Sequence, residues 1–218
     1  VDKECSEFAR SIGAASTEII RSNEVLQKAS GKVGEVVTIS ERIIQATASA
    51  GIATPDSPYI RLVQALADEV SARFAGAVLS GEIGMEALFD RQYRPIPGSD
   101  PVQMMTRFTD FTDRVLPAIQ EPAATRDQRI AFCVAVDENG YLPTHNRKFA
   151  EPQRPGDPAW NTANCRNRRI FNDRVGLAAG RNTQPFLLQT YRRDMGGGQF
   201  VLMKDISAPI TVNGRHWG

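Results

Sequence analysis

The apolar residues of the first fifty positions recur at alternating steps of four and three, which is the spacing of one continuous helical face. Residues 4–50 contain no proline. The register consists of Phe8, Ile12, Ala15, Ile19, Ser22, Leu26, Ala29, Val33, Val36, Ser40, Ile43 and Thr47. It predicts a coiled coil or a long bundle helix. Its seam is weak because small and polar residues interrupt it. The helix is therefore expected either to transmit a signal or merely to dimerise.

A second helix is predicted over residues 59–79, with Pro58 at its first position. Its apolar face consists of Tyr59, Val63, Leu66, Val70, Phe74 and Ala77. A short helical turn is expected at 85–89. The stretch 93–101 is too rich in proline and glycine for a regular element. We therefore place a domain boundary here, between a helical region, 1–93, and a second domain, 94–218.

A third helix is predicted to begin at Pro101, with Asp100 as its N-cap and a kink at Pro117. Its buried face is expected to contain Met104, Phe108, Phe111, Val115 and Ile119. This helix would pack against a sheet or pair with its counterpart in a dimer.

Five β-strands are predicted in the second domain, and glycine-containing turns separate several of them. Residues 129–136 are apolar on both faces, which is typical of a strand buried on both sides. An Asn-Gly turn leads from them into 141–145. After a polar crossover come 186–191 and 199–204, joined by Met195-Gly-Gly-Gly198, and then 210–217, which folds back at Asn213-Gly214. The predicted fold class is α+β: long N-terminal helices followed by a five-stranded antiparallel sheet with flanking helices.

Composition excludes several partners. The 26 Lys and Arg residues nearly balance the 25 Asp and Glu residues, whereas a nucleic-acid surface needs clustered positive charge. The longest apolar run, Ile130–Val136, is much shorter than a membrane span, and charges at positions 2–4 interrupt any signal peptide. The three cysteines are odd in number and form no CxxC pair, which suits a reducing cytosol. We expect a cytoplasmic domain that contacts neither nucleic acid nor membrane.

Enzymatic motifs are not found in the sequence. His145 and His216 are the only histidines, and a catalytic pairing of either with Cys133 or Cys165 is the weaker interpretation. The glycines at 196–198 join two strands, whereas a phosphate loop needs a helix after its glycines. There is no HExxH, zinc-type cysteine spacing or EF-hand loop. We therefore expect no enzyme.

A binding site is the more plausible function, because positive charge is concentrated in the crossover. Residues 164–174 contain four arginines but only Asp173 as an acid. Helical spacing would place Arg166 and Arg169 on one face with Asp173. A buried arginine needs an anionic partner. That partner is either a ligand carboxylate or an internal carboxylate, Asp173 or Asp205.

Alternation along 186–191 places Gln189 and Tyr191 on one face, where they could orient a ligand. Trp160 would wall the pocket or cap the core, and Asp205 would line the site or anchor a bend. The expected ligand-binding residues are Trp160, Asn164, Arg166, Arg169, Phe171, Asp173, Gln189, Tyr191 and Asp205.

The two histidines allow an alternative. If His145 and His216 met in one cavity, they could ligate haem axially or respond to pH. No CxxCH motif is present, so covalent haem attachment is excluded. A structural, hydrogen-bonded histidine is the simpler expectation at both positions, and no cofactor is then needed.

Several segments resemble the sensory region of bacterial methyl-accepting chemotaxis proteins. They are LFD at 88–90, YRPIPG at 93–98, FCVAVD at 132–137, NGYLPTHN at 139–146, NCRNRRIFND at 164–173, YRRDMGGG at 191–198, KDISAPI at 204–210 and GRHWG at 214–218. The resemblance covers roughly residues 50–218. It implies a PAS- or Cache-like sensor joined to a helical signalling part, with a strand that continues beyond Gly218.

The resemblance implies that residues 94–218 are a ligand-sensing domain and that a helical region, 1–93, relays the signal. The local arginine charge predicts that the ligand is a small anionic metabolite, and the heptad spacing predicts a homodimer. The signalling region of a parent receptor would then be a partner, and such a receptor could carry a membrane anchor elsewhere. The methyl-accepting hairpin is not in this sequence, so the chain alone would not address a kinase. Two alternatives stay open: a haem- or pH-responsive sensor, and a structural dimerisation module without a ligand.

Overall fold

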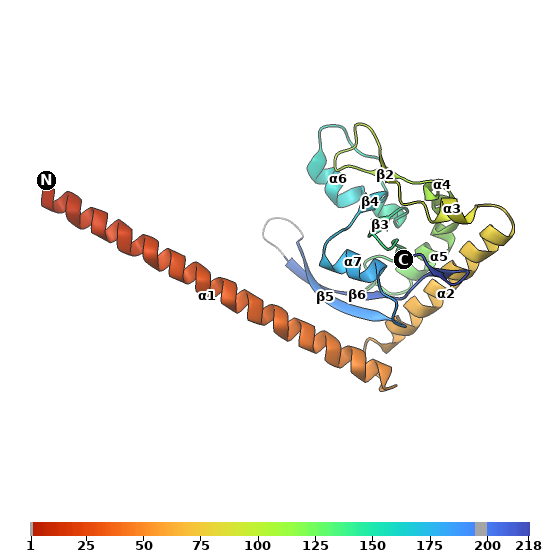
Figure 1. The fold of residues 1–218 in the computed structure, drawn as a ribbon, viewed down its shortest axis with the longest axis horizontal. Helices are drawn as coiled ribbons and strands as arrows, with labels where there is room; N and C mark the ends of the chain where they lie inside the picture. The colour runs from red at the N-terminus through yellow and green to blue at the C-terminus, as the bar shows by residue number, and fades with distance from the viewer. Residues whose placement is uncertain (1, 195–199) are drawn as a thin grey trace. The chain divides into compact units, whose positions relative to one another are not determined.

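A computed structural model describes the backbone of residues 2–194 and 200–218, and the side chains of residues 13, 15–192 and 201–218. The chain divides into two compact units, Val1–Ile52 and Ala53–Gly218. The predicted boundary at residues 93 and 94 falls inside the second unit. The fold is a mixture of helices and short antiparallel strand pairs (Figure 1).

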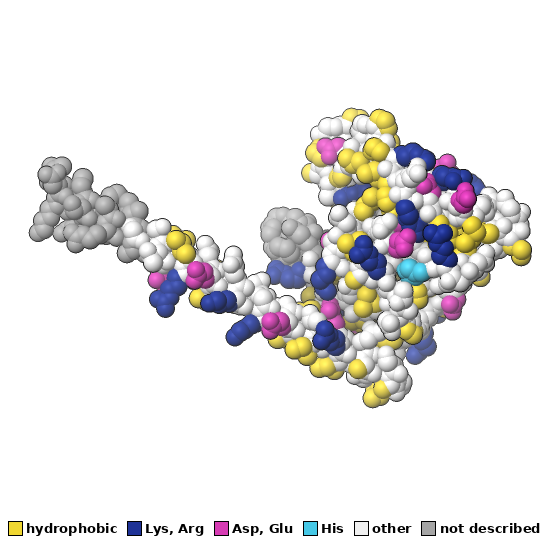
Figure 2. Space-filling view, in the orientation of Figure 1, with side chains coloured by type: hydrophobic (Ala, Val, Ile, Leu, Met, Phe, Trp, Pro, Cys, Tyr) yellow, Lys and Arg dark blue, Asp and Glu magenta, His cyan; other side chains and the backbone are white. Residues whose placement is uncertain are grey.

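The first unit is a single helix, α1, which runs from Asp2 to Ser49 (Figure 1). This confirms the long helix predicted from apolar spacing. Apolar side chains lie among charged ones along its surface (Figure 2). Leu26, Val33, Val36 and Ile43 of the predicted seam are 65%, 64%, 62% and 61% exposed. Within this unit, no other residues pack against these four side chains.

Helices supply much of the core of the second unit. They are α2 (Ser57–Leu79), α3 (Met85–Leu88), α4 (Thr109–Val115) and α5 (Pro117–Thr125), followed by η1 (Arg147–Phe149), α6 (Pro158–Asn164) and α7 (Arg174–Gly180). The predicted helix 59–79 and the turn at 85–89 are confirmed as α2 and α3. Fully buried rings of Phe74, Phe108, Tyr141 and Trp217 pack at the centre of the core.

The described strands form four antiparallel pairs. These are β1 (Arg94–Pro95) with β2 (Met104–Met105), β3 (Tyr141–Leu142) with β4 (Arg169–Ile170), β5 (Leu187–Asp194) with β6 (Phe200–Ser207), and β7 (Thr211–Val212) with β8 (Arg215–His216). Within residues 2–194 and 200–218 the pairs do not join into the predicted five-stranded sheet. The glycine loop predicted at 195–198 lies outside the described residues.

Two predicted turns are confirmed. Asn213 and Gly214 have φ of 51° and 79°, the left-handed pair that defines a type I′ hairpin turn. At the other turn, Gly140 has φ of 77°, and its N–H donates to the Asp137 carbonyl at 2.8 Å. A Cβ on Gly140 would also collide with the Phe171 carbonyl. Both the positive φ and this close approach therefore require glycine here.

Two predicted elements are wrong. The helix expected from Pro101 begins only at Thr109, because Met104 and Met105 pair with β1 and the Met104 N–H donates to the Arg168 carbonyl. Residues 129–136 belong to no strand ladder of the described chain. At Met104 and Met105, pairing with distant residues decides the backbone conformation, whereas the apolar segment 129–136 finds no ladder partner among the described residues.

No helix among the described residues is both long enough and apolar enough to cross a bilayer.

Candidate functional site

A cavity of about 780 Å³ lies within the second unit. Residues from α2 and α5, the segment 129–136, α7, and the strands β5 and β6 line it, together with Phe171 and Gly218. Its lining is mainly apolar, with a few polar groups. Cavities of this size commonly hold small molecules.

The main polar group of the cavity is Asp205. It pairs in register with Gln189 across the β5–β6 hairpin. Gln189 donates from Nε2 to the Val175 carbonyl of α7 at 3.1 Å, so this face of the hairpin is turned toward α7. Lys204 immediately precedes Asp205 in β6. Its ammonium group donates to both carboxylate oxygens of Asp56, at 2.8 and 2.7 Å, and Asp56 lies just before α2. The two faces of the hairpin therefore meet different helices.

Burial changes the chemistry of Asp205. The residue is half-buried, but its Oδ2 is shielded from solvent and has no hydrogen-bond partner in the described part of the chain. Desolvation raises the pKa of the carboxyl from 3.8 to about 6, and the charge of Asp173 also raises it, while the Gln189 amide lowers it. Asp205 can therefore accept a hydrogen bond from a bound molecule or form an ion pair with a cationic group on it.

Asp173 stands beside this group as the N-cap of α7. Its Oδ1 accepts hydrogen bonds from the backbone N–H groups of Val175 and Gly176 at 2.9 and 3.0 Å. Gly176 is needed here because a Cβ would collide with the Phe171 carbonyl. The cap thus orders the helix start that faces Gln189 and Asp205.

Gln120 is a second polar group, at the α5 end of the cavity. Its side chain is 2% exposed, and neither Nε2 nor Oε1 has a partner among the residues described. Cys133 lines the same cavity, and desolvation raises the pKa of its thiol to about 11, so the thiol is neutral. His145 packs there between Phe132 and Phe149, with ring centroids 5.5 and 5.0 Å apart.

Gln120→Leu is expected to raise the free energy of unfolding by about 1–3 kcal/mol, because it removes two buried polar atoms that lack partners. Urea unfolding of the two proteins measures the difference, and exposed Gln92→Leu is the matched control, expected within about 0.5 kcal/mol of the parent. If Gln120→Leu were destabilising instead, the amide would have a partner in solution.

The predicted site residues fall into two groups. Phe171, Asp173, Tyr191 and Asp205 line the cavity, as does His145, and Gln189 lies beside Asp205. Trp160, Asn164, Arg166 and Arg169 do not line it. The strand residues selected by alternation, Gln189 and Tyr191, therefore lie in or beside the cavity. The arginines selected by helical spacing, Arg166 and Arg169, do not.

The arginines and their neighbours have other contacts. Arg166 and Arg169 stack over the Phe171 ring, 5.0 and 5.2 Å from its centroid. Burial lowers the pKa of Arg169, and its guanidinium donates to the Thr162 carbonyl at 3.3 Å.

Trp160 and Asn164 belong to α6. Arg154 lies 3.6 Å from the centroid of the Trp160 ring, and Asn164 donates to the Trp160 carbonyl at 2.9 Å. These contacts hold the crossover together.

The two histidines are not brought into one cavity. His145 lines the cavity, but His216 is not in the lining, and its Nε2 lies 2.9 Å from the Gly180 carbonyl oxygen. Among the described residues there is no group of three His, Cys, Asp or Glu side chains that could hold a metal ion. The geometry therefore does not favour the paired-histidine alternative.

Sequence reasoning missed Gln120, and it considered Cys133 only as a catalytic partner of a histidine. A lone glutamine in a helix is normally exposed, and no spacing signal marks Gln120 as buried. Cys133 was expected on a buried strand, but not beside an open cavity.

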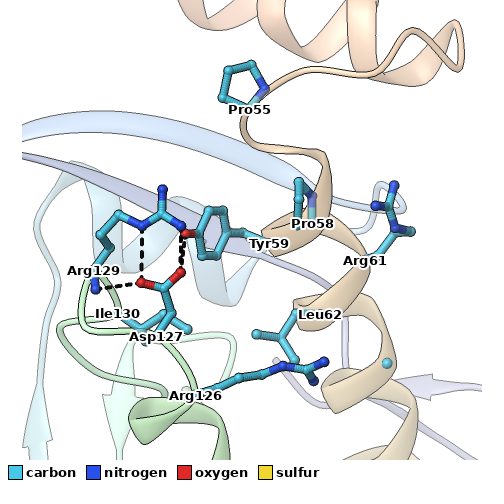
Figure 3. A pocket seen from close by; sticks show the side chains of 10 residues that line it. Pro55, Pro58, Tyr59, Arg61, Leu62, Arg126, Asp127, Arg129 and Ile130 are labelled. Atoms are coloured by element: carbon cyan, nitrogen blue, oxygen red, sulfur yellow. Dashed lines mark hydrogen bonds and ion pairs between the residues drawn. The ribbon is translucent and has the colours of Figure 1, made fainter.

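A smaller pocket of about 490 Å³ opens between the start of α2 and residues 126–130 (Figure 3). Its acid, Asp127, accepts from the Tyr59 hydroxyl at 2.7 Å and from the Arg129 guanidinium at 2.7 and 3.1 Å. The Arg129 hydrogen bonds hold the pKa of Asp127 well below its usual range. Arg61 is directed away from this acid in Figure 3. Because the acid is already satisfied, the larger cavity is the better candidate site.

Comparisons of the chain with protein-family models, with curated proteins and with solved structures gave no match.

Proposed function

We propose that this chain is a ligand-sensing domain of the chemoreceptor type, in which a small molecule binds on the α7 side of the cavity. The observation that carries the proposal is Asp205, a cavity-lining residue whose Oδ2 is shielded from solvent and has no hydrogen-bond partner in the described chain. A buried polar atom of this kind costs free energy unless something satisfies it. A bound ligand would do so.

The polar groups favour a ligand that donates hydrogen bonds or carries a positive charge. With a pKa of about 6, the Asp205 carboxyl is largely ionised at neutral pH. The anionic metabolite expected from the arginine-rich crossover would be repelled by this charge, and Arg166 and Arg169 do not line the cavity. Of the cations that do line it, Arg129 and Lys204 are paired with Asp127 and Asp56, and Arg174 donates to the Thr190 carbonyl. Phe171 and Tyr191 supply aromatic surface beside the acid. We therefore propose an amine, a guanidine or an amino-substituted ring.

A thermal-shift panel of polyamines, guanidines, aminopurines and carboxylates tests this chemistry. A ligand at 100 times its Kd stabilises the folded protein by about 2.7 kcal/mol. We expect amine or guanidine compounds to raise Tm and Asp205→Asn to weaken their binding at least about tenfold, because a charge-assisted hydrogen bond is lost. Asp110→Asn, at an exposed acid on α4, is the matched control. Binding of carboxylates alone, unaffected by Asp205→Asn, would contradict the proposal.

We further propose that α1 transmits the signal as a homodimer. Its seam of Leu26, Val33, Val36 and Ile43 is more than half exposed and repeats with coiled-coil spacing. Pairing two copies would bury this face.

Sedimentation tests the homodimer with one substitution on the seam and one away from it. Leu26→Asp is expected to shift the protein to monomer, because a charge at an a position is desolvated on pairing. Ile20→Asp, which is 59% exposed at a position off the seam, should leave the dimer intact. A parent protein that is monomeric at high micromolar concentration would count against the homodimer. A dimer that no compound stabilises would favour a purely structural dimerisation module.

A further inference from the structure

Gln120 interrupts the apolar residues with which α5 lines the cavity. Ile119, Gln120 and Ala123 are the lining residues of this helix, and all three are buried. Residues three or four positions apart share one side of a helix, so Gln120 occupies a place where core packing calls for an apolar side chain. A break in an otherwise consistent local pattern is typical of a functional position. Gln120 is therefore a candidate for contact with a ligand.

The backbone around Gln120 is fixed by contacts within the protein. Its N–H donates to the Leu116 carbonyl at 2.8 Å, and its carbonyl accepts from Asn146 Nδ2 at 3.4 Å. The buried Asn146 also accepts at Oδ1 from the Cys133 N–H at 2.8 Å, so it joins α5 to segment 129–136. The part of the cavity wall that contains Gln120 and Cys133 is thus ordered before any ligand binds, as a precise binding site requires.

The side-chain amide of Gln120 has both of its hydrogen-bonding functions unsatisfied. Nε2 and Oε1 are shielded from solvent, and neither has a hydrogen-bond partner in the described chain. Buried polar atoms normally have partners, because each one left unpaired costs free energy. Nε2 can only donate and Oε1 can only accept. One bound group that presents an acceptor beside a donor would satisfy both atoms.

Charged groups are poor complements to this amide. A carboxylate could accept from Nε2 but would leave Oε1 without a donor, and an ammonium group would leave Nε2 without an acceptor. The surroundings also disfavour an anion. Burial keeps the Cys133 thiol neutral by raising its pKa, and the negative charge of Glu121 raises that pKa further. The complement of Gln120 is therefore a neutral group.

We propose that Gln120 is a second anchor for the ligand and binds a neutral group with a hydrogen-bond acceptor beside a donor. A carboxamide, a lactam and the amino edge of an aminopurine have this pattern, and glutamine pairs with adenine through two parallel hydrogen bonds of this kind. The inference rests on the proposed function for the other half of the ligand, the cationic group at Asp205. The Gln120 half stands on its own observation.

A ligand that reached both anchors would have an apolar middle. Val63, Leu66 and Val70 of α2 line the cavity, as does Ile206 of β6. Aliphatic or aromatic surface on the ligand would bury against these side chains. The expected class is thus a compound with a cationic group and a neutral amide-like group, joined by an apolar spacer.

The test titrates the protein calorimetrically with pairs of compounds that differ only in the donor–acceptor group. Aminoalkanamides of increasing length are each paired with the amine in which an isopropyl group replaces the carboxamide. Neutral hexanamide is paired with the methyl ketone of the same length, and adenine is paired with purine. In each pair we expect the first compound to bind at least about tenfold more tightly, because its partner leaves a buried atom of Gln120 unpaired. The pair with the largest preference separates a carboxamide from an aminopurine.

Gln120→Leu should remove this preference, because leucine has a similar shape and no polar atom to satisfy. The matched control is Gln92→Leu, at an exposed glutamine that does not line the cavity, and it should retain the preference. A second readout is the NMR signal of the Gln120 side-chain amide, assigned as the one missing from Gln120→Leu. It should shift when a carboxamide or aminopurine binds, and stay in place with the isopropyl compounds.

Failure of this inference is distinguishable from failure of the proposed function. If amines do not bind through Asp205 but hexanamide or adenine binds in a Gln120-dependent manner, the second anchor stands and the cationic half is wrong. Equal affinity within every pair, or a preference that persists in Gln120→Leu, would overturn the inference even if amines bind. The absence of binding by every carboxamide and aminopurine would overturn it as well.

Discussion

Trp217→Ala is expected to lower the free energy of unfolding by about 3–5 kcal/mol, because it leaves a large cavity in the aromatic core. The Trp217 side chain is fully buried. Its ring lies 5.2 Å from that of Phe74 and 5.5 Å from that of Phe108, centroid to centroid, both in edge-on geometry. Its indole N–H donates to the Leu88 carbonyl at 2.9 Å. The residue therefore joins α2, α3 and the start of α4.

The backbone of Trp217 adds to the expected effect. Its carbonyl accepts from the Arg91 guanidinium at 2.9 Å and from the Glu138 N–H at 3.1 Å. Movement of this residue would also displace Gly218 from its place beside Val136. We therefore expect faster hydrogen exchange around Val136 as well as lower global stability.

Guanidinium unfolding measures the loss, with two variants for comparison. Trp217→Phe retains an aromatic ring but leaves the Leu88 carbonyl without its donor, so its loss should be clearly smaller than that of Trp217→Ala. Leu79→Ala, at a side chain that is 91% exposed, should change stability by less than about 0.5 kcal/mol. A loss below about 1 kcal/mol for Trp217→Ala would contradict the packing described above.

Asp205 is expected to make the protein less stable as pH rises from about 4 to about 6. The folded-state pKa is about 6, whereas the ordinary value is 3.8. Across this interval the folded protein retains a proton that the unfolded chain has released. Raising the pH therefore favours the unfolded state, and the loss is complete above the folded-state pKa. A shift of about two units corresponds to about 3 kcal/mol at neutral pH.

The difference between the parent protein and Asp205→Asn isolates this effect. Asparagine has nearly the same shape and does not ionise, so the variant should be more stable than the parent at pH 7 and nearly equal to it at pH 4. Acids whose pKa is lowered on folding change stability with pH in the opposite direction. Glu82 is one of them, because hydrogen bonds from Arg73 lower its pKa. Such contributions cancel in the difference. A difference that is independent of pH between 4 and 7 would show that the Asp205 carboxyl is well solvated.

The same measurement reports on the ligand. A bound amine or guanidine would stabilise the ionised carboxylate and shift the pKa of Asp205 back toward its ordinary value. The parent protein saturated with such a compound should then lose the pH dependence between 4 and 6. A neutral aliphatic compound that occupies the cavity would leave that dependence in place.

Local patterns were reliable wherever neighbouring residues decide the structure. The apolar spacing of residues 4–50 predicted α1, and Pro58 marked the start of α2. Asn213-Gly214 predicted its turn because few other residue pairs adopt two successive positive φ angles. Alternation along β5 placed Gln189 on the face that meets α7, with Asp205 opposite it on β6.

Patterns were unreliable where hydrogen bonds between distant residues decide the structure. The apolar spacing placed Met104 in a helix, but its N–H donates to the Arg168 carbonyl and its backbone pairs with strand β1. The arginine-rich crossover looked like a helical face toward a ligand, but it contains the short strand β4, and Arg166 and Arg169 stack on Phe171 instead. Segment 129–136 has the composition of a buried strand but no ladder partner in the described chain.

The sequence by itself determined α1, α2 and α3, the two glycine turns and the β5–β6 pairing, because periodicity and turn conformation depend on residues close together in the chain. Only the tertiary structure decided which polar groups are buried. Gln120 and Asp205 acquired their roles when α5 and β6 enclosed one cavity, and desolvation depends on the whole surrounding fold.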